Sequence, residues 1–323
     1  MEPQKEPHPK YLPHSIQSKS HDDEMELREI FKAIWKGKWV IIVTTVIFAI
    51  GSVSYALSLP NVYKADATLA PAETSSGSSL SKMAGQFGGI AALAGVNLSS
   101  NSVSQTDLAV EVMKSRHFVE SFIERHSIMV SLMAVKDWDL AKNQLIYDED
   151  IYNPSTGTWL RKPQGLRGAK PSPQEAFEVF NKEVLSITED KDSGLYKISI
   201  RHYSPYVAKE WVDWLIQDIN NVMRDRAVAE ASKNLTFLKK QLSKTAITDM
   251  QSTFYKLIEE QTKSLMLAEA QEEYIFKVID PSITPEIKSS PNRPLICILS
   301  VFLGGMLGVS IVIIRFAFQR RKL

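Results

Sequence analysis

Two long segments without charged residues constrain this chain more than any other feature of its sequence. Residues 39–59 read WVIIVTTVIFAIGSVSYALSL, and residues 295–314 read LICILSVFLGGMLGVSIVII. A helix of about 20 residues is roughly 30 Å long, which matches the hydrocarbon core of a bilayer. Buried helices of a soluble protein are the alternative, but such helices normally keep a polar face, which neither segment has. We therefore predict two transmembrane helices.

A cleaved signal peptide is a further alternative for the first segment. Residues 65–67 have the Ala-x-Ala form of a cleavage site. However, 38 residues precede the apolar run, and the run is longer than the apolar centre of a signal peptide. An uncleaved anchor is favoured.

Basic residues indicate how the two predicted spans are oriented. They gather before the first span and after the second, at Arg28, Lys32, Lys36, Lys38, Arg315, Arg320, Arg321 and Lys322. The flanks that face the middle of the chain carry fewer positive charges. Because positive flanks stay on the cytoplasmic side, we expect both termini in the cytoplasm and the middle of the chain outside it.

These observations predict five parts. They are a cytoplasmic tail at 1–38 with an amphipathic helix at 23–35, a span at 39–59, an extracytoplasmic domain at 60–294, a span at 295–314 and a tail at 315–323. Lys and Arg number 38 against 37 Asp and Glu, which argues against a nucleic-acid-binding protein. The single cysteine, Cys297, excludes an intramolecular disulfide and a zinc site built on cysteines.

The middle domain has the patterns of both strands and helices. Alternation of polar and apolar residues predicts strands at 61–71, 184–189, 195–202 and 274–280. Helical periodicity predicts helices at 107–126 and 172–182, the second opened by Ser172 and Pro173. Residues 74–105 are rich in Ser and Gly around an apolar centre, and read either as a flexible loop or as a loop that docks on an apolar surface.

The longest predicted helix begins at Ser204 and Pro205. No Gly or Pro follows until Pro281, and a helix of 40 residues is roughly 60 Å long, which is wider than a compact domain. We predict long helices over about 204–272, with a break near residues 245–249, that project from the domain or line an assembly. The stripe predicted to face other subunits is Ala227, Ala231, Leu235, Leu238 and Leu242.

Sequence motifs of known catalytic chemistry are missing. The chain has no phosphate-binding P-loop, no Gly-x-Ser-x-Gly, no His-Glu-x-x-His and no Cys-x-x-Cys. We therefore predict a chain that is not an enzyme, with no catalytic, cofactor-binding or metal-binding residues. Trp211 and Trp214 could stack on sugar rings, but at helical spacing a core position is favoured. Surface or helix-face positions are expected for His117, His126 and His202.

The second span follows a proline-rich run. Pro281, Pro285, Pro291 and Pro294 fall within DPSITPEIKSSPNRP, which predicts an extended, semi-rigid segment. Inside the span, Gly304 and Gly308 lie four residues apart and form a small-residue face that lets another helix approach closely. Glycine is also common in membrane helices in general, so this face alone is a weak signal.

This layout resembles the Wzz-type polysaccharide co-polymerases, the chain-length determinants of O-antigen and related bacterial polysaccharides. The resemblance covers residues 23–320. It rests on LREIFKAIWKGKWVII, PNVYKADATLAP, LIEEQTKSLMLAEAQEEYIFKVIDPSITPE and SSPNRPLICILSVFLGGMLG. It implies an α+β fold: a two-helix anchor in the bacterial inner membrane, a periplasmic α/β base domain and long extended helices, assembled as an oligomer.

The resemblance also implies a function and partners. The function is a regulator that sets the modal chain length of a surface polysaccharide, with no cofactor. The partners are further copies of the chain, a separate membrane polymerase, the bilayer and the growing lipid-linked polysaccharide. The family's motif for assembly or polymerase contact falls on Pro285, Pro291, Pro294, Gly304, Gly305 and Gly308.

Two alternatives to the chain-length regulator remain. One is a membrane adaptor for capsule or exopolysaccharide export that works with a separate kinase or channel. The other is a solute sensor, which would need an output module in the cytoplasm. Only nine residues follow Ile314, so within the family the kinase-free subclass is expected.

Overall fold

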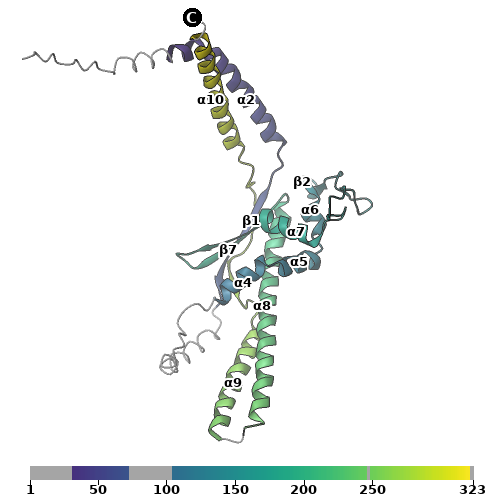
Figure 1. Cartoon of the computed structure of the whole chain (residues 1–323). Helices are drawn as coiled ribbons and strands as arrows, with labels where there is room; N and C mark the ends of the chain where they lie inside the picture. Colours follow the sequence, from purple (N-terminus) through teal and green to yellow (C-terminus); the bar gives the residue numbers. More distant parts are fainter. Residues whose placement is uncertain (1–30, 73–103, 246–247, 321–323) are drawn as a thin grey trace, which may run out of the picture. The chain divides into compact units, whose positions relative to one another are not determined.

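The computed structural model describes residues 31–72, 104–245 and 248–320 (Figure 1). The chain divides into two compact units, one made of residues 1–59 and 292–323 and the other of residues 60–291. Residues 31–36 are helical, but most of the predicted amphipathic helix at 23–35 and nearly all of the segment at 74–105 lie outside the described residues.

The first unit contains two long apolar helices, which lie side by side in Figure 1. α2 comprises Lys38–Ser58 and α10 comprises Arg293–Arg320. Both are long and apolar enough to cross a membrane, and only 11% and 17% of their most apolar windows are buried. The core helix of a soluble protein would be mostly buried, so this exposure supports two membrane spans.

The second unit is built on an antiparallel sheet in the order β6-β7-β1-β8. These strands are β1 (Tyr63–Pro71), β6 (Leu185–Asp190), β7 (Leu195–His202) and β8 (Phe276–Asp280). Ala65, Ala67 and Leu69 alternate toward the core along β1. The β6–β7 hairpin turns at Gly194, whose φ of +69° favours glycine. The four strands predicted from sequence are confirmed, with ends that differ by a few residues.

Short helices cover part of the sheet. They are α4 (Gln105–Lys114), α5 (Arg116–Arg125), α6 (Met129–Met133) and α7 (Pro173–Val179), followed by a π-helical turn at Phe180–Val184. The single helix predicted at 107–126 is wrong, because the chain breaks at Ser115. Ser115 has an extended backbone, and its side chain accepts a hydrogen bond from the N–H of Phe118 at the start of α5. Serine favours such a cap over a place inside a helix.

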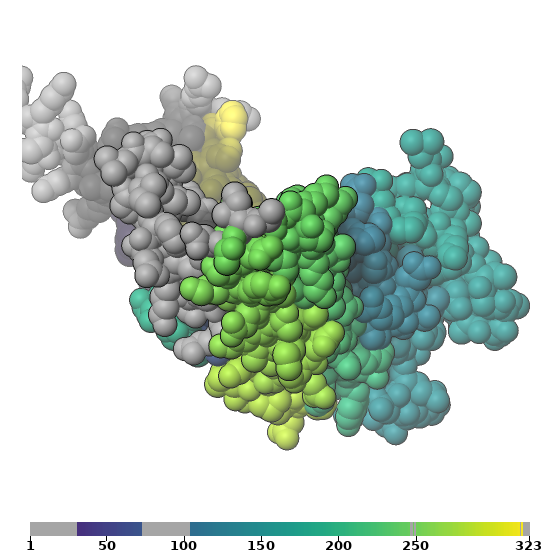
Figure 2. Space-filling view, turned by 90° about the horizontal axis from the view of Figure 1, so that it is seen from below, coloured from purple at the N-terminus to yellow at the C-terminus, as the bar shows by residue number. Residues whose placement is uncertain are grey.

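Two long helices form a hairpin. α8 runs over Pro205–Leu242 and α9 over Thr248–Ala270, and Figure 2 shows them packed together in green. The Ser204 side chain caps α8 by accepting a hydrogen bond from the N–H of Val207, as predicted. At 38 residues, α8 is about 57 Å long, which confirms the prediction of a helix longer than a compact domain.

The core of the second unit lies between the sheet and the first half of α8. Trp211, Leu215 and Ile219 of α8 are buried in one cluster with Ile198 and Ile200 of β7. Trp211 is 1% exposed, and its ring packs near the rings of Phe180 and His202. The core position predicted for Trp211 is confirmed.

A lobe of short strands follows α6. Its two small antiparallel sheets pair β2 (Val135–Asp139) with β3 (Gln144–Tyr147) and β4 (Tyr152–Asn153) with β5 (Thr158–Trp159). We call residues 135–170, which end with the loop after β5, the β2–β5 lobe. The sequence pattern predicted no regular elements in this stretch.

Candidate functional site

The small residues of α10 face α2 of the same chain. A Cβ atom added to Gly304 would lie 2.8 Å from the Cβ of Phe48, and one added to Gly308 would lie 2.8 Å from the Cα of Ile41. Such distances are shorter than carbon–carbon contact, so both positions require glycine at this helix spacing. Gly305 is different, because its added Cβ would be 3.8 Å from the hydroxyl of Thr45, an ordinary contact.

Thr44 supplies a polar contact across the same interface. Its hydroxyl is 3.3 Å from the carbonyl oxygen of Gly304, and also reaches the carbonyl of Ile41 in its own helix. Hydroxyls between membrane helices typically donate to backbone carbonyls in this way. No sequence motif marks this residue, although the Thr44-Thr45 pair in an otherwise aliphatic run is a signal that could have revealed it.

Arg293 ties the two spans together at the other end of the interface. Its Nε donates to the carbonyl of Ala56 at 3.0 Å, and Nη2 donates to the carbonyl of Leu59 at 3.3 Å. The last carbonyls of a helix have no partner within it, so the first residue of α10 caps the end of α2. This role has no motif in the sequence, because it needs two segments that are more than 230 residues apart.

The prolines before α10 lie in a segment without helix or strand. Pro285 is half-buried, Pro291 follows a cis peptide bond with Ser290, and Pro294 is exposed near the start of α10. Backbone hydrogen bonds join Val62, which precedes β1, to both Ser289 and Ser290. The segment contains no helix and no strand, and these hydrogen bonds hold its last residues alongside the start of β1. Its extended, semi-rigid character stays a prediction.

The predicted stripe on α8 lies against α9 of the same chain. Ala231 and Leu235 are buried, while Ala227, Leu238 and Leu242 are half-buried. The exposed apolar residues of the hairpin are others, namely Phe237, Met250, Tyr255 and Met266. The stripe therefore packs between the two helices of the hairpin. That it also contacts other subunits stays a prediction.

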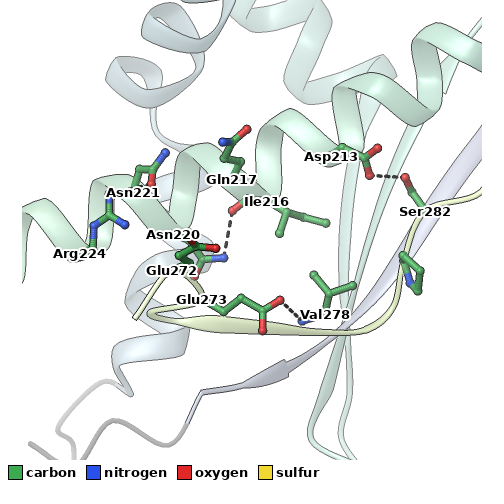
Figure 3. Close-up of a pocket in the computed structure, with 11 residues that line it drawn as sticks. Asp213, Ile216, Gln217, Asn220, Asn221, Arg224, Glu272, Glu273, Val278 and Ser282 are labelled. Carbon is green, nitrogen blue, oxygen red and sulfur yellow. Dashed lines mark hydrogen bonds between the residues drawn. The ribbon is translucent and has the colours of Figure 1, made fainter. Parts of the chain in front are cut away.

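A polar cavity of about 480 Å³ lies between α8 and β8 (Figure 3). The hydroxyl of Ser282 donates to Asp213 at 2.5 Å, and Lys209 forms an ion pair with the same carboxylate at 2.7 Å. On the opposite wall, Glu273 accepts a hydrogen bond from the N–H of Val278 at 3.2 Å. These side chains are occupied by partners within the chain.

Asn220 forms the inner end of this cavity. Its Oδ1 accepts hydrogen bonds from the N–H groups of Ile275 and Phe276, at 2.9 and 3.0 Å, and its Nδ2 donates to the carbonyl of Phe276 at 3.1 Å. The side-chain amide thus pairs with Phe276 as the peptide group of a further strand would. Asn220 is 4% exposed, and no sequence motif marks it.

Two histidines make contacts that the sequence did not predict. His126 does not simply face solvent: its Nε2 is 3.1 Å from a carboxylate oxygen of Asp218, and its ring stacks on Trp214. Asp218 also pairs with Arg125 at 2.7 Å. These contacts join α5 to α8, and pairing of this kind is what allows a carboxylate to be buried.

His202 is a core residue, so its predicted surface position is wrong. Its Nδ1 accepts a hydrogen bond from the N–H of Ser204, and its Nε2 contacts the carbonyl of Ser131 at 3.0 Å. Burial lowers the pKa of His202 from its ordinary value of 6.5, which keeps the ring neutral. Among the residues that the structure describes, no group of three His, Cys, Asp or Glu side chains could hold a metal ion.

Two family models match the chain. The model described as "Chain length determinant protein" (Wzz) matches residues 23–126, and the model described as "G-rich domain on putative tyrosine kinase" (GNVR) matches residues 241–317. Together they cover more than half of the sequence and both spans. No curated protein sequence matches the chain at a significant level.

Two solved structures are distantly similar. A "full-length bacterial polysaccharide co-polymerase" is 13% identical with a TM-score of 0.36, over 90% of this chain and 97% of that chain. A fragment of WzzB, a polysaccharide co-polymerase from Salmonella Typhimurium, is 9% identical with a TM-score of 0.30, over 71% of this chain and all of that chain. These scores are too low to carry an argument about this chain.

Proposed function

We propose, from the premise that the chain belongs to the Wzz family of chain-length determinants, that it sets the modal length of a surface polysaccharide of the O-antigen type. A separate membrane polymerase would make the polymer, and this chain would regulate it without catalysing the reaction. The observation that carries the proposal is the family match over residues 23–126, which joins the first span to β1, α4 and α5.

The proposal includes a topology and partners. Both termini lie in the cytoplasm, and the unit of residues 60–291 lies in the periplasm. Several copies assemble in the inner membrane and act on the polymerase and its lipid-linked product. The two apolar helices and the basic residues at their outer flanks support this arrangement.

The test is a gel of surface polysaccharide from a deletion strain and from the same strain carrying the gene again. We expect the deletion to turn a clustered ladder into a random, mostly short distribution, and the restored gene to bring the cluster back. A ladder that keeps its cluster after deletion would show that the chain does not set length.

The glycines of α10 offer a sharper version of this test. Gly304→Leu and Gly308→Leu should shift or abolish the preferred length, because either side chain would push α10 away from α2. Gly51→Leu in α2 is the matched control, because a Cβ added at Gly51 would meet no atom within 4 Å. Immunoblots of membrane fractions establish that all variants insert, and an unchanged ladder in both test variants would refute a role for this interface.

A second candidate function is a membrane adaptor for capsule or exopolysaccharide export. It is favoured by the match of residues 241–317 to a domain described on tyrosine kinases, and for the same reason the kinase-free subclass stays a prediction. The gel separates the two functions. Complete loss of the polymer after deletion supports the adaptor, whereas a change of length supports the regulator.

A further inference from the structure

Two positive side chains lie directly opposite one another on neighbouring strands of the large sheet. Lys64 of β1 is the register partner of Arg201 of β7. The adjacent residues Ala65 and Ile200 are buried in the core, so Lys64 and Arg201 lie on the other face of the sheet. The Cβ atoms of residues directly opposite are about 5 Å apart, and like charges at this spacing destabilise a sheet. The fold alone gives no reason for this pair.

Carboxylates on the same two strands do not neutralise the pair. Asp66 is the only acid of β1 and β7, and it forms an ion pair with Lys197 at 3.2 Å. Within the described part of the chain, no carboxylate lies within 4.0 Å of Lys64 or Arg201. On this face, β1 and β7 therefore carry three cations and one carboxylate, and two of the cations have no ion-pair partner.

The other strands of the sheet place their acids far from this pair. Asp190 of β6 is opposite Leu195 of β7, and Asp280 of β8 is opposite Thr68 of β1. Both positions are four or more residues along the strands from the two cations, which corresponds to at least ~13 Å. Glu189 precedes Asp190 and is similarly distant. The positive charge is therefore concentrated at one end of β1 and β7.

A cavity of about 390 Å³ is lined by Arg201 and by Tyr203, two residues further along the chain. Part of its wall is apolar and includes Val62, Met133 and Val135, the first residue of the β2–β5 lobe. Burial raises the pKa of Tyr203, so its hydroxyl stays protonated, and among the described residues this hydroxyl has no hydrogen-bond partner. The cavity thus adds a free hydrogen-bond donor to the guanidinium of Arg201.

Glu183 is the carboxylate that lines the same cavity. Its negative charge adds to the effect of burial on the pKa of Tyr203, but in the described structure it is not within ion-pair distance of Arg201. The balance of Lys64, Arg201 and Glu183 is one positive charge. Glu183 should therefore weaken the binding of an anion at this place without preventing it.

We propose that Lys64 and Arg201 bind a phosphate group from outside the chain, with the hydroxyl of Tyr203 as a further donor. A phosphate is favoured over a carboxylate for two reasons. The guanidinium fork of Arg201 matches two phosphate oxygens, and Lys64 supplies a second positive charge for a group that carries close to two negative charges. The proposal does not depend on whether the chain sets polymer length.

The test follows thermal unfolding of the full-length chain in non-ionic detergent as inorganic pyrophosphate is added. Sodium chloride at equal ionic strength is the reference. A ligand that binds only the folded chain raises the unfolding temperature as its concentration rises, so we expect a rise with pyrophosphate that chloride does not reproduce. Arg201→Gln and Lys64→Gln should each weaken the affinity about 10-fold or more, because each removes hydrogen bonds between charged groups.

The same variants distinguish ligand binding from a purely structural role. Without pyrophosphate, Arg201→Gln and Lys64→Gln should unfold at a higher temperature than the parent chain, because each removes the repulsion between the two cations. Lys197→Gln is the matched control: it breaks the ion pair with Asp66, so it should not raise the unfolding temperature and should keep the response of the parent chain to pyrophosphate. Glu183→Gln should strengthen that response.

The outcomes separate the site from its alternatives. Equal stabilisation by pyrophosphate and chloride would overturn the proposal, and so would an unchanged affinity in both test variants. Lower unfolding temperatures of both variants without pyrophosphate would also overturn it and assign the two cations to the stability of the sheet. A response to geranylgeranyl diphosphate at lower concentrations than to pyrophosphate supports a lipid-borne phosphate, whereas equal responses support the phosphate of a soluble compound.

Discussion

Buried polar side chains hold together parts of the second unit that are far apart in the sequence. Asn220 joins α8 to β8, and Asp218 joins α8 to the end of α5. Tyr196 of β7 donates a hydrogen bond to Asp107 in the first turn of α4 at 2.9 Å. Burial and this hydrogen bond raise the pKa of Tyr196 to about 12, so its hydroxyl stays a donor at any physiological pH.

The lowered pKa of His202 makes the stability of the folded chain depend on pH. The pKa of His202 in the folded chain lies below the ordinary value of 6.5. The contribution of the neutral ring to the free energy of unfolding is therefore complete above pH 6.5 and is lost as the pH falls below that value. The unfolding temperature of the full chain in detergent should therefore fall between pH 7.5 and pH 5.5.

The matched variants isolate this effect. In His202→Asn, the unfolding temperature should fall less between pH 7.5 and pH 5.5 than in the parent chain, even if the variant unfolds at a lower temperature at every pH. His117 is exposed, so His117→Asn should show the same decrease in unfolding temperature as the parent chain. Equal falls in His202→Asn and the parent would assign the acid sensitivity to other groups.

Local signals explain why most elements could be predicted. The Ser204-Pro205 start of α8, the break before α9 and the alternation along β7 are carried by neighbouring residues, and the structure confirms each. The break at Ser115 was missed because the apolar periodicity continues across it. Serine at an exposed helix position and serine at a cap look alike in a sequence.

The hairpin of α8 and α9 makes a prediction about the stripe on α8. Leu235→Ala should lower the free energy of unfolding by about 2–4 kcal/mol, because Leu235 is buried and the neighbouring helix cannot collapse fully into the space. The neighbouring Thr236→Ala, at an exposed position, should change it by less than ~0.5 kcal/mol. Denaturant unfolding in detergent measures both.

Protein concentration distinguishes packing within the chain from packing between copies. If Leu235→Ala lowers the free energy of unfolding by the same amount at all protein concentrations, the result supports the contact with α9. If the free energy of unfolding decreases only at concentrations where the protein is oligomeric, the stripe faces another subunit.

At the scale of the whole molecule, the proposed topology can be tested directly. A reporter enzyme that is active only in the periplasm should be active when inserted in the exposed β6–β7 turn at residue 193, and inactive when fused after residue 323. A fluorescent protein that folds only in the cytoplasm should give the opposite pattern. The same activity at both sites would contradict two spans with one domain between them.

The whole molecule also shows where sequence reasoning ends. The two spans and the Gly304/Gly308 face follow from composition and spacing, and the α+β class follows from the family resemblance together with the strand and helix patterns. Such signals describe the character of a single segment. They do not report what it touches: Thr44 under Gly304, Arg293 on the end of α2 and Asn220 on β8 each join residues that the sequence separates by tens or hundreds of positions.

The pairing of Asn220 with Phe276 limits how copies of this chain can associate through the edges of their sheets. A sheet that continues from copy to copy needs two open edges, one on each partner. β6 forms one edge of this sheet, but on β8 an amide side chain takes the place of the next strand and Glu273 covers the N–H of Val278. Copies therefore cannot add to one another strand by strand through β8 into an endless fibre.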